Sequence, residues 1–318
     1  WSLMTAASGA STGYASMAAT RMGVGMGEAG LTPTANSLIG DLFPPNSRGK
    51  ALGIYISAVP IGTMLAGLIG GWLASAWGWR ATFVGLGAAG LALTALFWLT
   101  FREPARGRLD DPSSLPERGK YSIAETVRHL YGKRSCRYFF AAFAVVGFVG
   151  AAINNWTPAF FMRSHGMDLM QIAASVGLVF GIGGAAGMLA GGWMADGFSG
   201  RDASGYLRIP ALAVLLGLPL YFAALLVQGT TLAMVLLVAP VTVAAVILPP
   251  ILALLQRLTK NNMRAVSVAV FLIVVHLFGM GFGPLLVGGT SDSLQPLAGT
   301  DSLRYALLCV IPLNLLAA

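Results

Sequence analysis

The sequence predicts an all-α, polytopic membrane protein, and three observations support this fold class. First, 56% of the 318 residues are hydrophobic and the mean hydropathy is +0.74, whereas only 10% are charged, against about 25% in soluble domains. Second, apolar runs of roughly 20 residues recur along the chain, which is the length of a helix that crosses a bilayer. Third, Lys and Arg gather in alternate connections between these runs, as they do in multi-pass membrane proteins.

Ten segments have the length and composition of spanning helices. In chain order they are residues 1–18, 19–41, 48–74, 79–101, 137–162, 170–195, 207–228, 231–256, 264–288 and 302–318. The chain opens at Trp1 and stops at Ala318 inside apolar sequence, and the first and last segments are short. We therefore expect a piece of a longer protein.

The distribution of positive charge orients these segments, because Lys and Arg are enriched in cytoplasmic connections. If residue 1 lies on the cytoplasmic side, 16 of the 20 Lys and Arg residues fall in cytoplasmic connections. Three (Arg80, Arg163 and Arg304) fall in outer connections, and Arg21 lies within a helix. This asymmetry predicts a multi-pass inner-membrane protein whose first residue faces the cytoplasm. It also explains the net charge of +8, so nucleic acid is not an expected partner.

One polar connection is much longer than the others. It covers residues 102–136 and separates residues 1–101, with four segments, from residues 137–318, with six. Within it, Ser122 and Glu125 have the spacing of a capping box, in which each side chain binds a free backbone N–H of the other residue. The apolar residues that follow share one helical face, which predicts a short amphipathic helix on the inner membrane surface. The alternative is a disordered linker.

Four helices, a basic loop and six helices become a regular six–loop–six plan if two helices precede residue 1. Several motifs agree with that plan: Arg21 through Glu28-Ala29 and Pro33 to Asp41-Leu42-Phe43-Pro44 and Arg48; Gly70-Gly71-Trp72 followed by Gly78-Trp79-Arg80; Gly191-Gly192-Trp193-Met194-Ala195-Asp196 with Gly200-Arg201-Asp202; and Asn262-Met263-Arg264-Ala265 followed by Gly279 to Pro284 and Gly288 to Asp292. These motifs resemble those of the major facilitator superfamily, and all but the third resemble its spinster-like members. One departure is Gly197-Phe198-Ser199, where the superfamily's loop signature often has a basic residue.

The resemblance implies a major facilitator two-half bundle, of which this chain supplies ten predicted transmembrane helices of an original twelve. Residues 1–101 would be helices 3 to 6, residues 102–136 the cytoplasmic linker, and residues 137–318 helices 7 to 12 with the last one truncated. It further implies a secondary transporter that works by alternating access, is coupled to protons, and moves an amphipathic or lipid-like substrate such as a lysolipid or a sphingoid-type molecule. Two alternatives stay open: a carrier of small organic anions, and a non-transporting receptor or scaffold.

Glu28 is the candidate proton-coupling residue. A carboxylate in the middle of a spanning helix costs about 2.5–3.5 kcal/mol on insertion scales, so it is a functional hypothesis by default. Arg21 lies two turns earlier on the same face, about 10 Å away along the helix axis. We expect both side chains to face one water-filled cavity, and the resemblance assigns this pair to substrate and proton handling. The alternative is a buried ion pair with a partner outside this chain.

The remaining candidates fall into two groups. Further cavity residues are predicted from polar or aromatic side chains inside spanning segments: Tyr55, Asn154, Asn155, Trp156 and His276. Asp41 with Arg48, and Asp196 with Arg201, are predicted as a conformational latch that forms in one transport state and breaks in the other. The alternative to the latch is a set of static surface pairs, each worth under about 1 kcal/mol.

Other chemistry is not expected. Cys136 and Cys309 form no CxxC motif, and the three histidines are dispersed, with no HExxH or GxSxG pattern. The sequence therefore predicts no metal, no cofactor and no enzymatic activity. Its expected partners are a small amphipathic substrate, protons and the lipid bilayer, and we expect a monomer. Pro249-Pro250, together with Pro240, predicts a broken helix in the segment 231–256.

Overall fold

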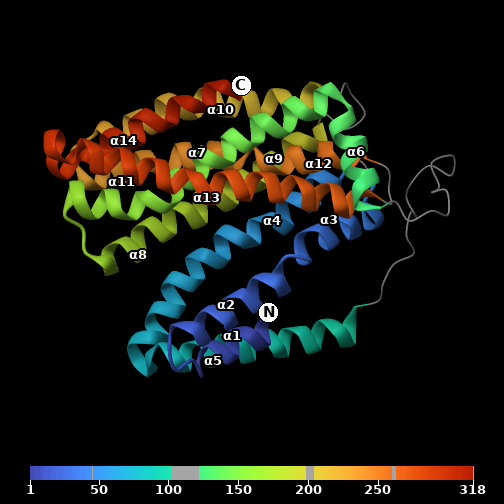
Figure 1. The fold of residues 1–318 in the computed structure, drawn as a ribbon, viewed down its shortest axis with the longest axis horizontal. Coiled ribbons are helices and arrows are strands. Elements are labelled where there is room, and N and C mark those ends of the chain that lie inside the picture. Colours follow the sequence, from blue (N-terminus) through green and yellow to red (C-terminus); the bar gives the residue numbers. More distant parts are fainter. Residues whose placement is uncertain (45, 102–121, 198–203, 260–262, 318) are drawn as a thin grey trace.

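A computed structural model describes residues 1–44, 46–101, 122–197, 204–259 and 263–317. Every regular element in these ranges is a helix, which confirms the predicted all-α class. The helices form two groups. Figure 1 shows α1, α2 and α5 apart from the C-terminal helices, while α3 and the start of α4 converge on them near α6.

The first two predicted segments are divided differently from the expectation. α1 (Ser2–Ser8) is short, and α2 (Tyr14–Glu28) is followed by α3 (Leu31–Leu42) after two residues. The predicted boundary near residue 18 is wrong, because the chain turns at residues 9–13. The helical path therefore runs from residue 14 to residue 42, with a break at Ala29 and Gly30, whose backbone stays in the right-handed helical region.

The next two predicted segments meet at a sharp turn. α4 (Arg48–Leu65) continues through a π-helical stretch, η1 (Ala66–Gly70), into α5 (Gly71–Thr100). Inside α5 the backbone of Gly78 adopts φ +77°, a conformation that side chains with a Cβ rarely take. Gly78 therefore separates the two antiparallel spans, close to the predicted boundary.

The short helix predicted within the linker is present. α6 (Ile123–Gly132) begins with the predicted capping box, in which Glu125 N–H donates to Ser122 Oγ over 3.1 Å and Ser122 N–H donates to Glu125 Oε2 over 2.7 Å. Leu130 is 1% exposed and belongs to the apolar core, whereas Ile123 is 69% exposed. α6 thus packs on α7 and α13, and its position at the inner membrane surface stays a prediction.

The second half follows the predicted order of helices. They are α7 (Arg134–His165), α8 (Leu169–Leu178) with η3 (Val179–Gly183) and α9 (Gly184–Gly197), α10 (Ser204–Leu226), α11 (Thr230–Ala245) with α12 (Leu248–Leu258), α13 (Arg264–Ala298), and η5 (Gly299–Asp301) with α14 (Ser302–Val310) and η6 (Ile311–Leu316). The break between α11 and α12 comes just before Pro249-Pro250, which confirms the predicted broken helix.

Six stretches of the described chain are long and apolar enough to cross a membrane. They are Arg48–Thr100, Arg134–His165, Ala174–Gly197, Ser204–Leu226, Thr230–Leu258 and Arg264–Leu316. The first and last contain 53 residues each and hold two predicted segments apiece, so these stretches account for eight of the ten. The other two predicted segments are divided among α1, α2 and α3.

Two apolar clusters hold the helices together. One consists of residues between Val149 and Ile311 and lies wholly within the second half. The other joins the halves, because Ile39, Leu52 and Ile56 from α3 and α4 pack with residues of α6, α7, α9, α10, α12 and α13. The second cluster lies where α3 ends and α4 begins. We call this the basic end of the bundle, since Arg48, Lys50 and Arg264 lie there.

Candidate functional site

Arg21 is held by two contacts within the first half. Its Nη2 donates to Ser8 Oγ of α1 over 2.6 Å, and its guanidinium carbon lies 4.8 Å from the centre of the Phe83 ring on α5. The side chain nevertheless stays exposed. A guanidinium fixed by a hydroxyl and an aromatic face keeps donors free for an anionic group.

Glu28 is the last residue of α2, at the midpoint of the helical path from residue 14 to residue 42, and its side chain is exposed. Two glycines on the same helix bring α1 close. A Cβ on Gly27 would lie 2.7 Å from the Trp1 backbone nitrogen, and one on Gly23 would lie 2.8 Å from the Met4 side chain. Gly23 and Gly27 therefore serve helix packing, as small residues do in membrane helices.

The predicted cavity residues of α7 have different surroundings. Asn154 and Asn155 are exposed, and Asn155 Nδ2 donates to Ala151 O of the same helix over 2.8 Å. Trp156 is half-buried against α13: its indole N–H donates to Pro284 O over 2.8 Å, and a Cβ on Gly288 would touch its ring at 3.0 Å. The structure thus gives Trp156 a packing contact between α7 and α13 within the second half.

The other two predicted cavity residues lie apart. Tyr55 of α4 is half-buried against the cluster that joins the halves. His276 is exposed on α13. In this conformation the structure does not bring Arg21, Glu28 and the candidates of the second half into contact, so a shared cavity stays a prediction.

Asp196 connects the two halves at the basic end. Its carboxylate, at the end of α9, accepts hydrogen bonds from the backbone N–H groups of Gly49 (2.6 Å) and Lys50 (2.9 Å) in the first turn of α4. These N–H groups have no partner within their own helix, and a helix N-terminus favours negative charge. Asp196 therefore caps a helix of the opposite half.

The close approach of α4 and α9 depends on glycines. A Cβ on Gly49 would lie 2.5 Å from the Gly192 carbonyl oxygen, and a Cβ on Gly53 would lie 2.7 Å from that of Met188. Neither position has room for a larger side chain. Small residues on both helices thus bring Asp196 within hydrogen-bonding distance of the α4 backbone.

The other predicted latch residues have different contacts. Arg48 is 7% exposed, and it donates from Nε to Phe43 O (2.9 Å) and from Nη2 to Gly40 O (2.6 Å), at the C-terminal end of α3. Asp41 lies on the same turn of α3 and is partly buried. Arg201 lies outside the described residues. The hydrogen bonds of Asp196 to the start of α4 are therefore one contact between the halves, and the ion pairs of the latch stay a prediction.

The sequence reasoning missed a buried pair of amides between the halves. Gln256 Nε2 of α12 donates to the Asn36 backbone oxygen of α3 over 3.0 Å and lies 3.4 Å from Asn36 Oδ1. Asn36 is 0% and Gln256 is 2% exposed. The available signal was the position of Asn36 inside an apolar segment, where an amide is costly without a partner.

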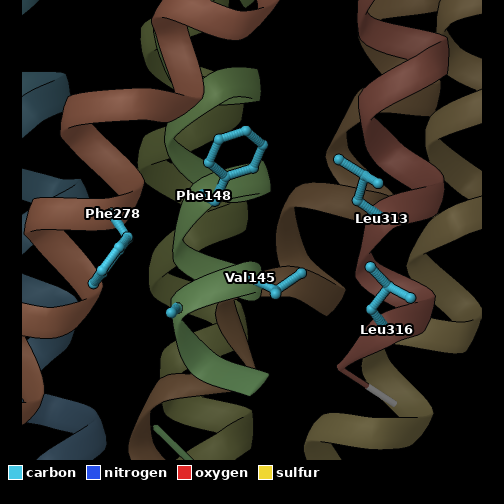
Figure 2. A pocket seen from close by; sticks show the side chains of 6 residues that line it. Val145, Phe148, Phe278, Leu313 and Leu316 are labelled. Carbon is cyan, nitrogen blue, oxygen red and sulfur yellow. The ribbon is translucent and has the colours of Figure 1, made fainter. Parts of the chain in front are cut away.

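An apolar cavity of about 190 Å³ lies within the second half. Figure 2 shows Val145 and Phe148 of α7 between Phe278 of α13 and two leucines of η6, Leu313 and Leu316. Its lining is suited to hydrocarbon. The cavity does not include any of the polar residues predicted from the sequence.

Comparisons with known proteins agree with this arrangement. The family model described as Major Facilitator Superfamily matches residues 1–284. An MFS-type efflux pump of Mycolicibacterium smegmatis is 32% identical over 98% of this chain and 71% of its own length. Protein spinster homolog 3 of Danio rerio is 27% identical over 90% of this chain, which spans only 60% of that relative.

A solved structure is similar over the full chain. It is a bacterial homolog of the human lysosomal transporter spinster, in an inward-facing and unoccupied conformation, with 27% identity and a TM-score of 0.72. The match covers 100% of this chain and 79% of that one. The relatives are transporters rather than enzymes.

Proposed function

Since this chain belongs to the Major Facilitator Superfamily and resembles its spinster proteins, we propose that it is a secondary active transporter that works by alternating access. Its substrate in this proposal is an amphipathic or lipid-like molecule, and its driving force is a proton gradient. In this proposal the protein lies in the inner membrane of the cell. Its basic end faces the cytoplasm, because arginines and lysines are enriched on the cytoplasmic side of membrane proteins. The transporter acts as a monomer.

The observation that carries the proposal is the contact between halves at the basic end. The halves meet through α3 and α4 on one side and α9, α12 and α13 on the other. Asp196 binds backbone groups that belong to the opposite half. Contacts of this kind exist in one state and are lost when the halves rotate apart, which is what a two-state carrier needs. Asp41, Arg48 and Arg201 belong to the same latch in this proposal.

Proton coupling is assigned to Glu28. An ionisable residue at mid-span is rare unless it serves a pathway or a relay, and Glu28 is exposed at the centre of its helical path. Arg21 then holds the charged part of the substrate, because its guanidinium is fixed by Ser8 and Phe83 yet stays exposed. Tyr55, Asn154, Asn155 and His276 line the rest of the path in this proposal.

The substrate class follows from a combination of charge and apolar surface. Arg21 suits an anionic headgroup, and the abundance of apolar residues suits a hydrocarbon body. A carrier of small organic anions is the second candidate, because the same guanidinium would bind a carboxylate directly. Chain length separates the two: transport of lysolipids should improve with acyl length, whereas an anion carrier should reject long chains.

The test is transport by the full-length protein in proteoliposomes under a pH gradient, with lysolipids and small organic anions as substrates. Glu28→Gln should lose accumulation driven by the gradient and keep exchange of substrate across the membrane. Glu125→Gln is the matched control, because it makes the same change in the capping box of α6, where Gln is also tolerated. Unchanged gradient-driven uptake by Glu28→Gln would exclude the coupling role. Substrate binding with no uptake would instead favour a receptor or scaffold.

A further inference from the structure

Asn36 and Gln256, which we call the amide clasp, join the two halves in the interior of the protein. The donor is Gln256 Nε2 of the second half, and the acceptor oxygens belong to Asn36 of the first half. Asn36 Nδ2 in turn donates to Thr32 O over 2.9 Å. Since both residues are at most 2% exposed, water does not compete with the clasp while the basic end is closed.

The clasp is incompletely paired. Gln256 Oε1 is buried and has no hydrogen-bond partner in the described part of the chain. A buried acceptor without a partner raises the free energy of the state that buries it. When the halves separate at the basic end, water reaches both amides and supplies that partner. The closed state therefore gains a contact between halves and simultaneously carries a penalty that opening removes.

The clasp residue Asn36 lies on α3, which follows the helix that carries Glu28. Asn36 comes eight residues after Glu28, about 12 Å along a helix, and Pro33 lies between them. α2 packs against α1 through Gly23 and Gly27, whereas α3 packs against α13 of the opposite half. The break at residues 29–30 thus separates α2, which packs on the first half, from α3, which packs on the second half at the basic end.

We propose that the amide clasp sets the equilibrium between the closed and open forms of the basic end, and that the unpaired Gln256 oxygen keeps the two forms close in free energy. Gln256 and Asn36 are positioning residues in this scheme, since they act on the conformational step and not on the substrate. The inference rests on the proposed function, because it assumes that the basic end opens and closes during transport.

The experiment measures the distance between the halves at the basic end. Spin labels on Lys50→Cys and Arg208→Cys, both exposed in the wild type, report this distance in the full-length protein in nanodiscs, with Cys136 and Cys309 replaced by Ala. Gln256→Met removes the donor to the Asn36 backbone oxygen and leaves the buried Asn36 Oδ1 without its partner. It should raise the ratio of open to closed forms about tenfold.

The decisive variant is the double substitution Asn36→Ala with Gln256→Met. It removes both amides and keeps the length of the side chain at position 256, so no polar group is left unpaired. Replacing both partners of a buried hydrogen bond by apolar groups is nearly neutral or stabilising. The ratio should therefore return to the wild-type value or fall below it.

The outcomes are distinguishable. Asn46→Ala, at an exposed position of the loop before α4, is the matched control and should leave the distances unchanged. A double variant that is as open as Gln256→Met would overturn the clasp, and so would a Gln256→Met variant with wild-type distances. A wild-type protein that keeps one distance at every pH and substrate concentration would instead refute the proposed function. Thermal unfolding of each variant verifies that it folds.

Discussion

Replacing Asp196 by Asn tests whether a side chain of one half holds the helix N-terminus of the other. The carboxylate accepts two backbone hydrogen bonds, of 2.6 Å and 2.9 Å, from Gly49 and Lys50. Asn has nearly the same shape, but it is neutral and turns one acceptor oxygen into a donor. That donor would face a backbone N–H group, so one of the two hydrogen bonds is lost and the other is weakened.

The expected magnitude follows from these contacts. A hydrogen bond to a charged group contributes about 1.5–3 kcal/mol, and a charge near a helix terminus about 0.3–1 kcal/mol when it is exposed. Because Asp196 is only partly buried, solvent screening puts the loss near the lower end, at about 1–2 kcal/mol. This corresponds to a shift of about 5- to 30-fold towards the open basic end.

The assay measures the distance between spin labels at positions 50 and 208, as in the experiment on the amide clasp, in the absence of substrate. Asp168→Asn is the matched control: Asp168 caps α8 by accepting from Gln171 N–H over 2.8 Å inside one half, and Asn is an equally good cap. The control should leave the distance distribution unchanged. A distribution for Asp196→Asn that matches the wild type would refute the idea that this carboxylate holds the halves together.

Two further predictions concern packing. Gly192→Val should force α4 and α9 apart, because even a Cβ at this position would lie 3.1 Å from Gly53 Cα. Overpacking costs about 1–3 kcal/mol, so the distance between the spin labels should lengthen. Gly177→Val is the control and should leave that distance unchanged, because a Cβ there meets nothing within 4 Å. Trp156→Phe removes the hydrogen bond to Pro284 O and should lower stability by about 0.5–1.5 kcal/mol, measured as the thermal midpoint in detergent. Trp98→Phe, at a side chain that is 81% exposed, is its control, and equal midpoints for the two variants would contradict the packing role of Trp156.

Local sequence was sufficient for most of the helices. Hydropathy depends on composition within some 20 residues, and the cost of placing such a run in water or in lipid does not depend on distant parts of the chain. The capping box of Ser122 and Glu125 and the break before Pro249-Pro250 are local in the same sense. Glu28 could be singled out because a carboxylate is costly at mid-span wherever it occurs.

The first segment shows where local reasoning failed. Residues 1–18 are apolar enough to be one helix, yet the chain turns after Ser8 and starts a new helix at Tyr14. The turn is fixed by contacts with another segment, since Arg80 Nη2 donates to Ser11 O over 3.2 Å. Hydropathy carries no information about such a contact.

The sequence by itself determined that this is a helical membrane protein with a major facilitator plan, and it identified Arg21, Glu28 and Asp196 as residues to test. Only the tertiary structure decided that Asp196 binds the start of α4, and that Asn36 meets Gln256, a residue 220 positions away. The physical reason is the range of the interactions. Insertion into a bilayer depends on each segment alone, whereas a contact between halves needs small residues and hydrogen-bonding groups on two helices to coincide in space.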